Sequence, residues 1–215
     1  MIQLHYFPGN ASAAPHILLE ELGAAFELKY VDRQVAAHKS AEYLKLNPNG
    51  LIPVLVDGDF ALYETAAILL HLADSNPGAA LAPGVGTPER AQFYKWLMWM
   101  TNTLQATLIL YFYPERWVDD GNAAAAAQVK AHAEAKVGGL LDQMDAHLAS
   151  HGRDWFGGEH YSVLDPLAFL LCRWTRGFAL PARSLPHLGR YLPRVLARPA
   201  VRRAFASEKI VEPFY

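Results

Sequence analysis

A segment rich in proline and glycine, residues 76–88, separates two parts of this chain that have different patterns. Before it, short β-type runs alternate with helical stretches, and after it the pattern is helical throughout. The formal net charge also changes, from −5 over residues 1–76 to +3 over residues 77–215. We therefore expect an α/β domain over 1–76, a linker over 77–87 and an all-helical domain over 88–215.

The first part is predicted to have the order βαβ followed by ββα. Strands are expected over 2–7, 26–31, 53–56 and 60–62, and helices over 13–22, 40–46 and 64–75. Helices of the second part are predicted over 88–113, 122–150, 163–178 and 186–198, with a short piece after Pro199. Gly23 is a suitable C-terminal cap for the first helix, and Asp57-Gly58 is typical of a hairpin turn.

Composition and charge exclude several classes of protein. The 215 residues are 52% hydrophobic with a net charge of −2, which is typical of a globular chain and gives no reason to expect nucleic acid as a partner. The start of the chain lacks a signal-peptide pattern, and the apolar stretch 96–113 contains five polar residues, so we expect a cytoplasmic protein without membrane contact. Cys172 is the single cysteine and is interpreted as a buried, inert thiol. No metal is expected.

The junction between the first strand and the first helix is a candidate site. A strand that passes through Pro8-Gly9 into a helix presents unpaired N–H groups at the positive end of the helix dipole, which favours an anion such as a thiolate. Ser12 could donate a hydrogen bond to that anion, or could simply cap the helix. Asn10 is the rival donor, and Tyr6 is a weaker third choice.

Two further segments suit an extended peptide ligand. A cis bond between Ile52 and Pro53 would turn the Ile52 backbone outward to pair with such a ligand, although a sheet edge is the ordinary explanation for a proline that opens a strand. Glu64 and Thr65 lie at a predicted helix start, where both side chains suit the dipole in any case. As a site, Glu64 would accept a hydrogen bond from a ligand ammonium, and Thr65 would donate one to its carboxylate.

Taken in this order, the three segments resemble the cytosolic glutathione transferase family over nearly the whole chain. The loop Pro8-Gly9-x-x-Ser12-x-x-x-His16 is similar to that of the bacterial beta class, whereas residues 38–48 look like the theta-class pattern. Ser162-x-x-Asp165 is similar to the capping box of the family, although a local interpretation makes Asp165 itself the helix cap. The resemblance implies a thioredoxin-like N-terminal domain followed by an all-helical C-terminal domain.

The resemblance also implies a glutathione site and a homodimer. The glutathione-binding residues that it implies are His38, Lys39, Ile52, Pro53, Glu64 and Thr65. The first two would face the glycine carboxylate, the Ile52 backbone would pair with the cysteinyl part, and the last two would hold the γ-glutamyl end. A hydrophobic co-substrate site between the domains would be lined by Phe7, Tyr111, Tyr113 and Trp117. Aromatic residues at helical spacing more often belong to the core. If these residues do line a pocket, an apolar, flat electrophile is expected.

Two departures from the beta class shape the expected mechanism. Ala11 stands where that class carries a cysteine, and Gln105-Ala106 stand where it carries a His-Lys pair. Covalent disulfide chemistry therefore lacks its protein nucleophile, and the chain is expected to activate the thiol of glutathione itself. Ser12 is the preferred donor to the thiolate, ahead of Asn10.

Two other functions remain open at this point. One is a protein that binds glutathione or another ligand on the same fold without catalysis, because a fold does not settle a function. The other is a glutathione-dependent isomerase of a dicarboxylate, for which Arg173 or Arg176 would be the basic residues.

Overall fold

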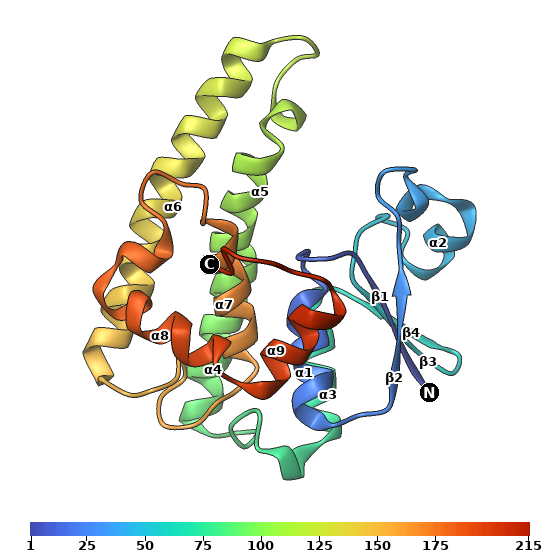
Figure 1. The fold of residues 1–215 in the computed structure, drawn as a ribbon, viewed down its shortest axis with the longest axis vertical. Coiled ribbons are helices and arrows are strands. Elements are labelled where there is room, and N and C mark those ends of the chain that lie inside the picture. The colour runs from blue at the N-terminus through green and yellow to red at the C-terminus, as the bar shows by residue number, and fades with distance from the viewer.

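The computed structural model describes residues 1–215 and shows two lobes that are joined by the segment between α3 and α4 (Figure 1). The first lobe has a four-stranded sheet with the order β2-β1-β3-β4, in which β1 runs parallel to β2 and the other neighbours are antiparallel. Its elements are β1 (Ile2–Tyr6), α1 (Ala13–Leu22), β2 (Phe26–Tyr30), α2 (Ala41–Leu46), β3 (Val54–Asp57), β4 (Phe60–Tyr63) and α3 (Thr65–Ser75). The predicted thioredoxin-like order of βαβ and ββα is confirmed.

The second lobe is helical, as predicted. Its elements are α4 (Pro88–Trp99), a π-helical segment (Met100–Gln105), α5 (Ala106–Phe112), α6 (Ala123–His151), α7 (Leu164–Trp174), α8 (Pro186–Leu196) and α9 (Pro199–Ser207). The first three follow one another without a break, so the helix expected over 88–113 is present but contains a π-helical insertion. Helix α7 ends four residues earlier than expected, because Thr175 turns the chain: its hydroxyl donates to the Cys172 carbonyl and accepts from the Ala182 N–H.

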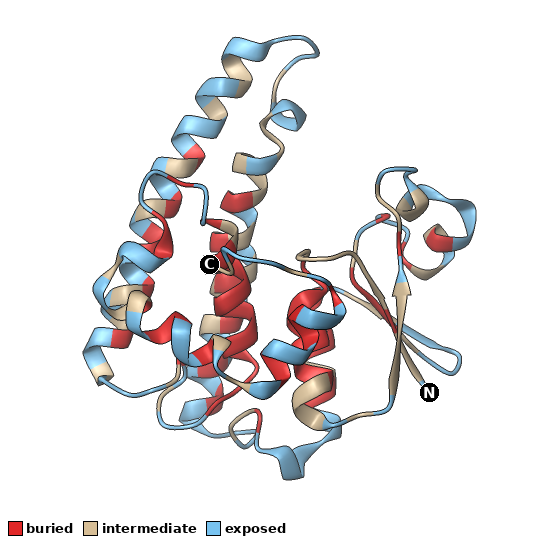
Figure 2. Cartoon of the chain, viewed as in Figure 1, coloured by how far each residue is buried: buried red, intermediate tan, exposed pale blue.

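Two helices carry the core that joins the lobes. Every residue of α7 from 164 to 173 is buried, and so is every residue of α1 from 13 to 19 (Figure 2). Helix α1 lies between the sheet and the helical lobe and packs against α3, α7 and α9 (Figure 1). The β1–α1 loop therefore begins on the sheet and ends at the boundary between the lobes.

The start of α7 is held by a buried carboxylate. Asp165 accepts hydrogen bonds from the N–H groups of Ser162 and Phe156, each at 2.8 Å, and from the Tyr191 hydroxyl at 2.8 Å. The Ser162 hydroxyl accepts from the Leu164 N–H at 3.3 Å. The helix begins at Leu164, so the interpretation of Asp165 as the cap is wrong, whereas the predicted Ser162–Asp165 contact is present.

The buried single thiol is also confirmed. Cys172 lies within α7 and is 1% exposed, and burial raises its pKa far above the ordinary range. None of the helices combines the length and the apolar character that a membrane crossing would need.

Candidate functional site

The β1–α1 loop is closed by the Ser12 side chain. The Ser12 hydroxyl donates to the Phe7 carbonyl and accepts from the Phe7 N–H, both at 3.2 Å, and the residue is fully buried. Ser12 occupies the N-cap position of α1, as the cap interpretation predicted, but its side chain makes no capping hydrogen bond. Instead, the hydroxyl ties the two ends of the loop together and has its one proton engaged there.

Asn10 projects from the same loop and is only half-buried. Its Oδ1 accepts from the Ala11 N–H at 2.7 Å, which fixes the orientation of the side-chain amide, and its NH₂ group makes no hydrogen bond within the chain. Tyr6, the last residue of β1, has its ring edge-on to the rings of His16 and Tyr30. Burial, followed by the charges of Glu208 and Tyr30, raises the pKa of Tyr6. Within the loop itself, residues 7–12, Asn10 is the side-chain donor that is left free.

The loop is anchored by residues of the helical lobe that the sequence analysis did not identify. Glu208, directly after α9, accepts a hydrogen bond from the Gly9 N–H at 2.8 Å and contacts His16 Nδ1 at 2.7 Å. The side chains of Glu208 and His16 are both fully buried. From α7, the Trp174 indole N–H donates to the Gly9 carbonyl at 3.0 Å. Both polar groups of the Gly9 backbone are therefore held by the second lobe.

The segment before β3 contains the predicted cis peptide bond, between Ile52 and Pro53. The loop that leads to it is held through the Leu51 carbonyl, which accepts from the Tyr43 hydroxyl at 2.8 Å and from the Asn47 side-chain amide at 2.9 Å. Two donors on one carbonyl oxygen fix the backbone next to Ile52, which is half-buried.

Glu64 occupies the turn between β4 and α3 in a backbone conformation that residues other than glycine rarely adopt. Its φ is +71° and its ψ is 116°, and its side chain is exposed. A residue in such a region costs about 1–3 kcal/mol and persists only where the surroundings hold it, most often at functional sites. Thr65 follows at the first position of α3 and is buried. The two residues lie at the helix start that the sequence predicted.

His38 and Lys39 lie on a single 3₁₀ turn, Ala37–Lys39, beside the loop that leads to Ile52. Lys39 Nζ donates to the Asn49 carbonyl at 3.1 Å, and a Cβ added to Gly50 would stand only 2.8 Å from the His38 carbonyl oxygen. Partial burial, followed by the charges of Arg33, Lys39 and Arg116, lowers the pKa of His38. The structure therefore brings these two residues next to the segment at 47–53.

The four residues predicted for the hydrophobic co-substrate site are not all together. Phe7, stacked on Tyr30 at 5.9 Å, and Tyr113, after α5, both face the Arg33 guanidinium, which lies 5.5 Å and 5.9 Å from their ring centres. Arg33 also donates to the Tyr113 hydroxyl at 2.8 Å and so links the two lobes.

The other two residues lie apart from this contact. The Tyr111 ring packs against Phe178 at 4.2 Å and belongs to the edge of the core. Trp117 is 59% exposed and makes no aromatic contact. Tyr111 therefore follows the core alternative that its spacing allowed.

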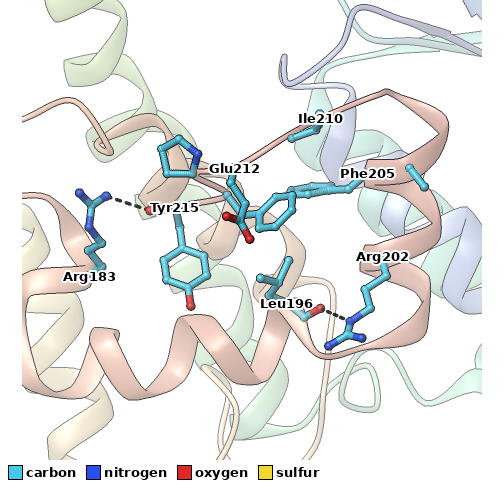
Figure 3. Close-up of a pocket in the computed structure, with 10 residues that line it drawn as sticks. Arg183, Leu196, Arg202, Phe205, Ile210, Glu212 and Tyr215 are labelled. Carbon is cyan, nitrogen blue, oxygen red and sulfur yellow. Dashed lines mark hydrogen bonds between the residues drawn. The ribbon is translucent and has the colours of Figure 1, made fainter.

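A hollow of the molecule lies away from these residues. It has a volume of about 1010 Å³ and lies between α8, α9 and the segment 210–215, with residues such as Phe205, Phe214 and Tyr215 around it (Figure 3). None of the predicted site residues lines it.

Comparison with known proteins agrees with this arrangement. The N-terminal and C-terminal domain models of glutathione S-transferase match residues 1–74 and 99–199. Glutathione S-transferase GST-4.5 of Xanthomonas campestris pv. campestris is 31% identical over 96% of this chain and 98% of its own length.

Solved structures agree as well. A sphingomonad glutathione S-transferase in complex with glutathione is 32% identical with a TM-score of 0.82, covering 97% of this chain and 100% of its own. The bacterial beta-class glutathione S-transferase of Sphingomonas chungbukensis gives the same four values. This chain therefore belongs to the glutathione S-transferase family and is a transferase.

Proposed function

We propose that this transferase binds reduced glutathione across residues 38–65 and attacks an electrophile with the glutathione thiolate, which Asn10 and the start of α1 stabilise. The proposal is supported by the position of the free Asn10 amide on the loop that precedes the buried N-terminal turn of α1. For the rest of glutathione, the proposal uses three features described above: the fixed backbone at Ile52, the strained residue Glu64 and the cationic side chain of Lys39.

The required stabilisation is within reach of these groups. A free thiol has a pKa near 8.5, and lowering it by about two units requires about 2.7 kcal/mol. A hydrogen bond to a charged acceptor supplies about 1.5–3 kcal/mol, and a helix N-terminus adds about 0.5–1 kcal/mol. One amide donor with α1 behind it therefore suffices without a general base.

The Ser12 hydroxyl is the weaker candidate for contact with sulfur, because it already donates to the Phe7 carbonyl. We propose that Ser12 closes the loop and that Asn10 contacts the thiolate. This reverses the order of preference that the sequence alone suggested.

Thiolate absorbance of bound glutathione, measured against pH, tests the assignment. Asn10→Ala removes the donor without introducing a charge, and we expect it to raise the thiol pKa by more than one unit. Ser12→Ala is the matched comparison and should act mainly on stability. If neither substitution moved the thiol pKa, the thiolate mechanism proposed for this loop would be wrong.

There are two alternatives to catalysis by thiolate attack: the first is separated from it by experiment, and the second is weakened by the structure. A non-catalytic glutathione-binding protein would be retained on immobilised glutathione yet turn over no aryl halide, epoxide or hydroperoxide. The dicarboxylate isomerase loses one of its two candidate residues, because Arg173 is buried and donates to the carbonyls of Pro213 and Phe214. Arg176 is exposed and donates to the Arg173 carbonyl at 3.2 Å.

We also propose assignment to the beta class in a form without its cysteine. Position 11 is a buried alanine, and the only thiol, Cys172, lies inside α7. Mixed-disulfide chemistry with a protein cysteine is therefore not proposed. The similarity of residues 38–48 to the theta class stays a prediction.

Homodimerisation is proposed from exposed apolar side chains near the end of the sheet and on α4. Phe60, Tyr94 and Met98 are 46%, 38% and 39% exposed. Light scattering should give about twice the mass of one 23.8 kDa chain, and a monomer at micromolar concentration would contradict the proposal.

A further inference from the structure

Two guanidinium groups converge on one aromatic ring at the boundary between the lobes. Arg116 lies 4.0 Å from the centre of the Tyr113 ring, and Arg33 lies 5.9 Å from the same centre while donating to the Tyr113 hydroxyl. Arg33 follows β2 in the first lobe, whereas Arg116 belongs to the 3₁₀ turn after α5 in the second. The contact therefore collects positive charge from both lobes on one side of the proposed co-substrate space.

Neither Arg33 nor Arg116 takes part in an ion pair of the structure. Arg33 is half-buried, so its charge is less screened by water than that of a fully exposed arginine. Partial burial, followed by the charges of Arg33, Lys39 and Arg116, lowers the pKa of His38, so both guanidinium groups act on this residue. An anion that contacts both arginines would be stabilised by two positive charges.

The rings beside these cations suit the rest of a ligand. Phe7 lies 5.5 Å from the Arg33 guanidinium and is part of the loop that carries Asn10. A flat substrate whose reacting carbon approaches the thiolate at Asn10 would lie beside Phe7, with a substituent directed toward Arg33. Guanidinium groups bind carboxylates through two parallel hydrogen bonds, which a lysine cannot reproduce.

We infer that the electrophile carries a carboxylate, and that Arg33 and Arg116 bind this carboxylate while Phe7 and Tyr113 contact its ring. The inference rests on the proposed function and gives the substrate a chemical class, an aromatic acid rather than a wholly apolar compound. Lys39 and His38 stay assigned to the glycine carboxylate of glutathione, so the two arginines are left for the second substrate.

A matched pair of electrophiles tests the inference: 4-chloro-3,5-dinitrobenzoate and its methyl ester. The two share the reacting carbon and the leaving group but differ in charge and in intrinsic reactivity, because an ester para to the reacting carbon activates the ring more than a carboxylate does. The acid-to-ester ratio is therefore the ratio of the two kcat/KM values divided by the ratio of the uncatalysed rates with glutathione. For the unmodified protein we expect this ratio to exceed one and to fall as salt is added. Arg33→Gln should lower that ratio about tenfold, which corresponds to the loss of one charge-assisted hydrogen bond.

The other variants separate charge from structure. Arg116→Gln should lower the same ratio by a smaller factor, about threefold, because Arg116 is exposed. Arg33→Lys should keep part of the preference. Arg190→Gln, which removes one exposed cation from α8, is the control and should leave the ratio unchanged. The KM for glutathione should stay the same in all four variants.

Several results would overturn the inference. One is an acid-to-ester ratio at or below one in the unmodified protein. A second is an unchanged ratio in both Arg33→Gln and Arg116→Gln. A third is a rise in the KM for glutathione with no change in the ratio, which would assign Arg33 to glutathione.

Failure of the proposed function would look different. If neither electrophile were consumed, binding of unreactive 3,5-dinitrobenzoate and its methyl ester to the glutathione-loaded protein would be compared by calorimetry. Tighter binding of the acid that is lost in Arg33→Gln would support the inference without catalysis. Equal binding of acid and ester would contradict it.

Discussion

Removal of the Glu208 carboxylate should destabilise the protein and its thiol-binding loop together. Glu208 accepts from the Gly9 N–H at 2.8 Å and contacts His16 Nδ1 at 2.7 Å, and the Glu208 and His16 side chains are fully buried. In Glu208→Ala the buried His16 ring and the partly buried Gly9 N–H lose their partner. A buried polar group left unsatisfied costs about 1–3 kcal/mol and a partly buried one costs less, so the two together predict a loss of about 3 kcal/mol in the free energy of unfolding.

The effect on activity should exceed the effect of instability. Gly9 precedes Asn10, so release of the Gly9 N–H allows the proposed thiolate donor to move. A displacement of about 1 Å in a catalytic group costs about a hundredfold in rate. We therefore expect kcat/KM for the folded variant to fall by about 10- to 100-fold. Glu208→Gln keeps one acceptor oxygen, so its loss in the free energy of unfolding should be about half of the loss in Glu208→Ala.

Urea unfolding followed by tryptophan fluorescence gives the stability, and the same samples give kcat/KM under conditions where they are folded. Asp142→Ala serves as the control, because Asp142 is an exposed acid on α6 with no ion pair or hydrogen bond from its side chain. The reasoning fails if Glu208→Ala and Asp142→Ala have free energies of unfolding within about 1 kcal/mol of each other. It also fails if Glu208→Ala is destabilised but retains full activity when folded.

Three further predictions address other parts of the site and core. Burial raises the pKa of Asp165 to about 6, so between about pH 4 and pH 6 the native protein binds a proton that the unfolded chain lacks. Urea titrations should therefore show the free energy of unfolding falling by up to about 3 kcal/mol as the pH rises from about 4 to about 6. Asp165→Asn should show no such fall. Gly50→Ala should lower the free energy of unfolding by at least about 2 kcal/mol and raise the KM for glutathione, because the φ of Gly50 is +58° and the new Cβ meets the His38 carbonyl. Gly58→Ala is the control: with φ +59° and open space around the new Cβ, it should cost about 1 kcal/mol. Equal costs for the two substitutions would contradict the steric argument. Glu64→Gly relieves a strained φ of +71°, so thermal unfolding should show unchanged or higher stability. The KM for glutathione should rise at least about tenfold in this variant. An unchanged KM would show that Glu64 does not belong to the site.

The sequence predicted what short-range rules decide. Gly23 ends α1 in the left-handed conformation that glycine permits, and the predicted hairpin joins β3 to β4. Its turn is Gly58-Asp59, one residue later than predicted, because Asp57 is the last residue of β3 and pairs with Phe60. The order of elements followed from these local signals. The differences lie at the ends of elements, as at Thr175, where a contact with Ala182 decides the boundary, and in the π-helical insertion between α4 and α5.

The site was predicted less completely, because its geometry depends on contacts that a local pattern does not contain. Glu208 is about 200 residues from Gly9 in the sequence, and a lone acid near the end of a helix carries no signal for that contact. Arg33 follows a strand and was not identified from the sequence, because only the fold places its guanidinium beside both Phe7 and Tyr113. Ser12 illustrates a different limit: the sequence supplies a hydroxyl at the correct position, but only the folded loop shows that Phe7 engages it.

The bond from Glu208 to the Gly9 N–H has a consequence for biosynthesis. The first lobe is translated long before residue 208 leaves the ribosome, so on the nascent chain the loop at residues 7–12 forms without that anchor. An N-terminal fragment of residues 1–76 would likewise carry every glutathione contact proposed here and still lack the carboxylate that orients its loop. A fully competent pocket is therefore a late product of synthesis, even though its lining is encoded in the first third of the gene.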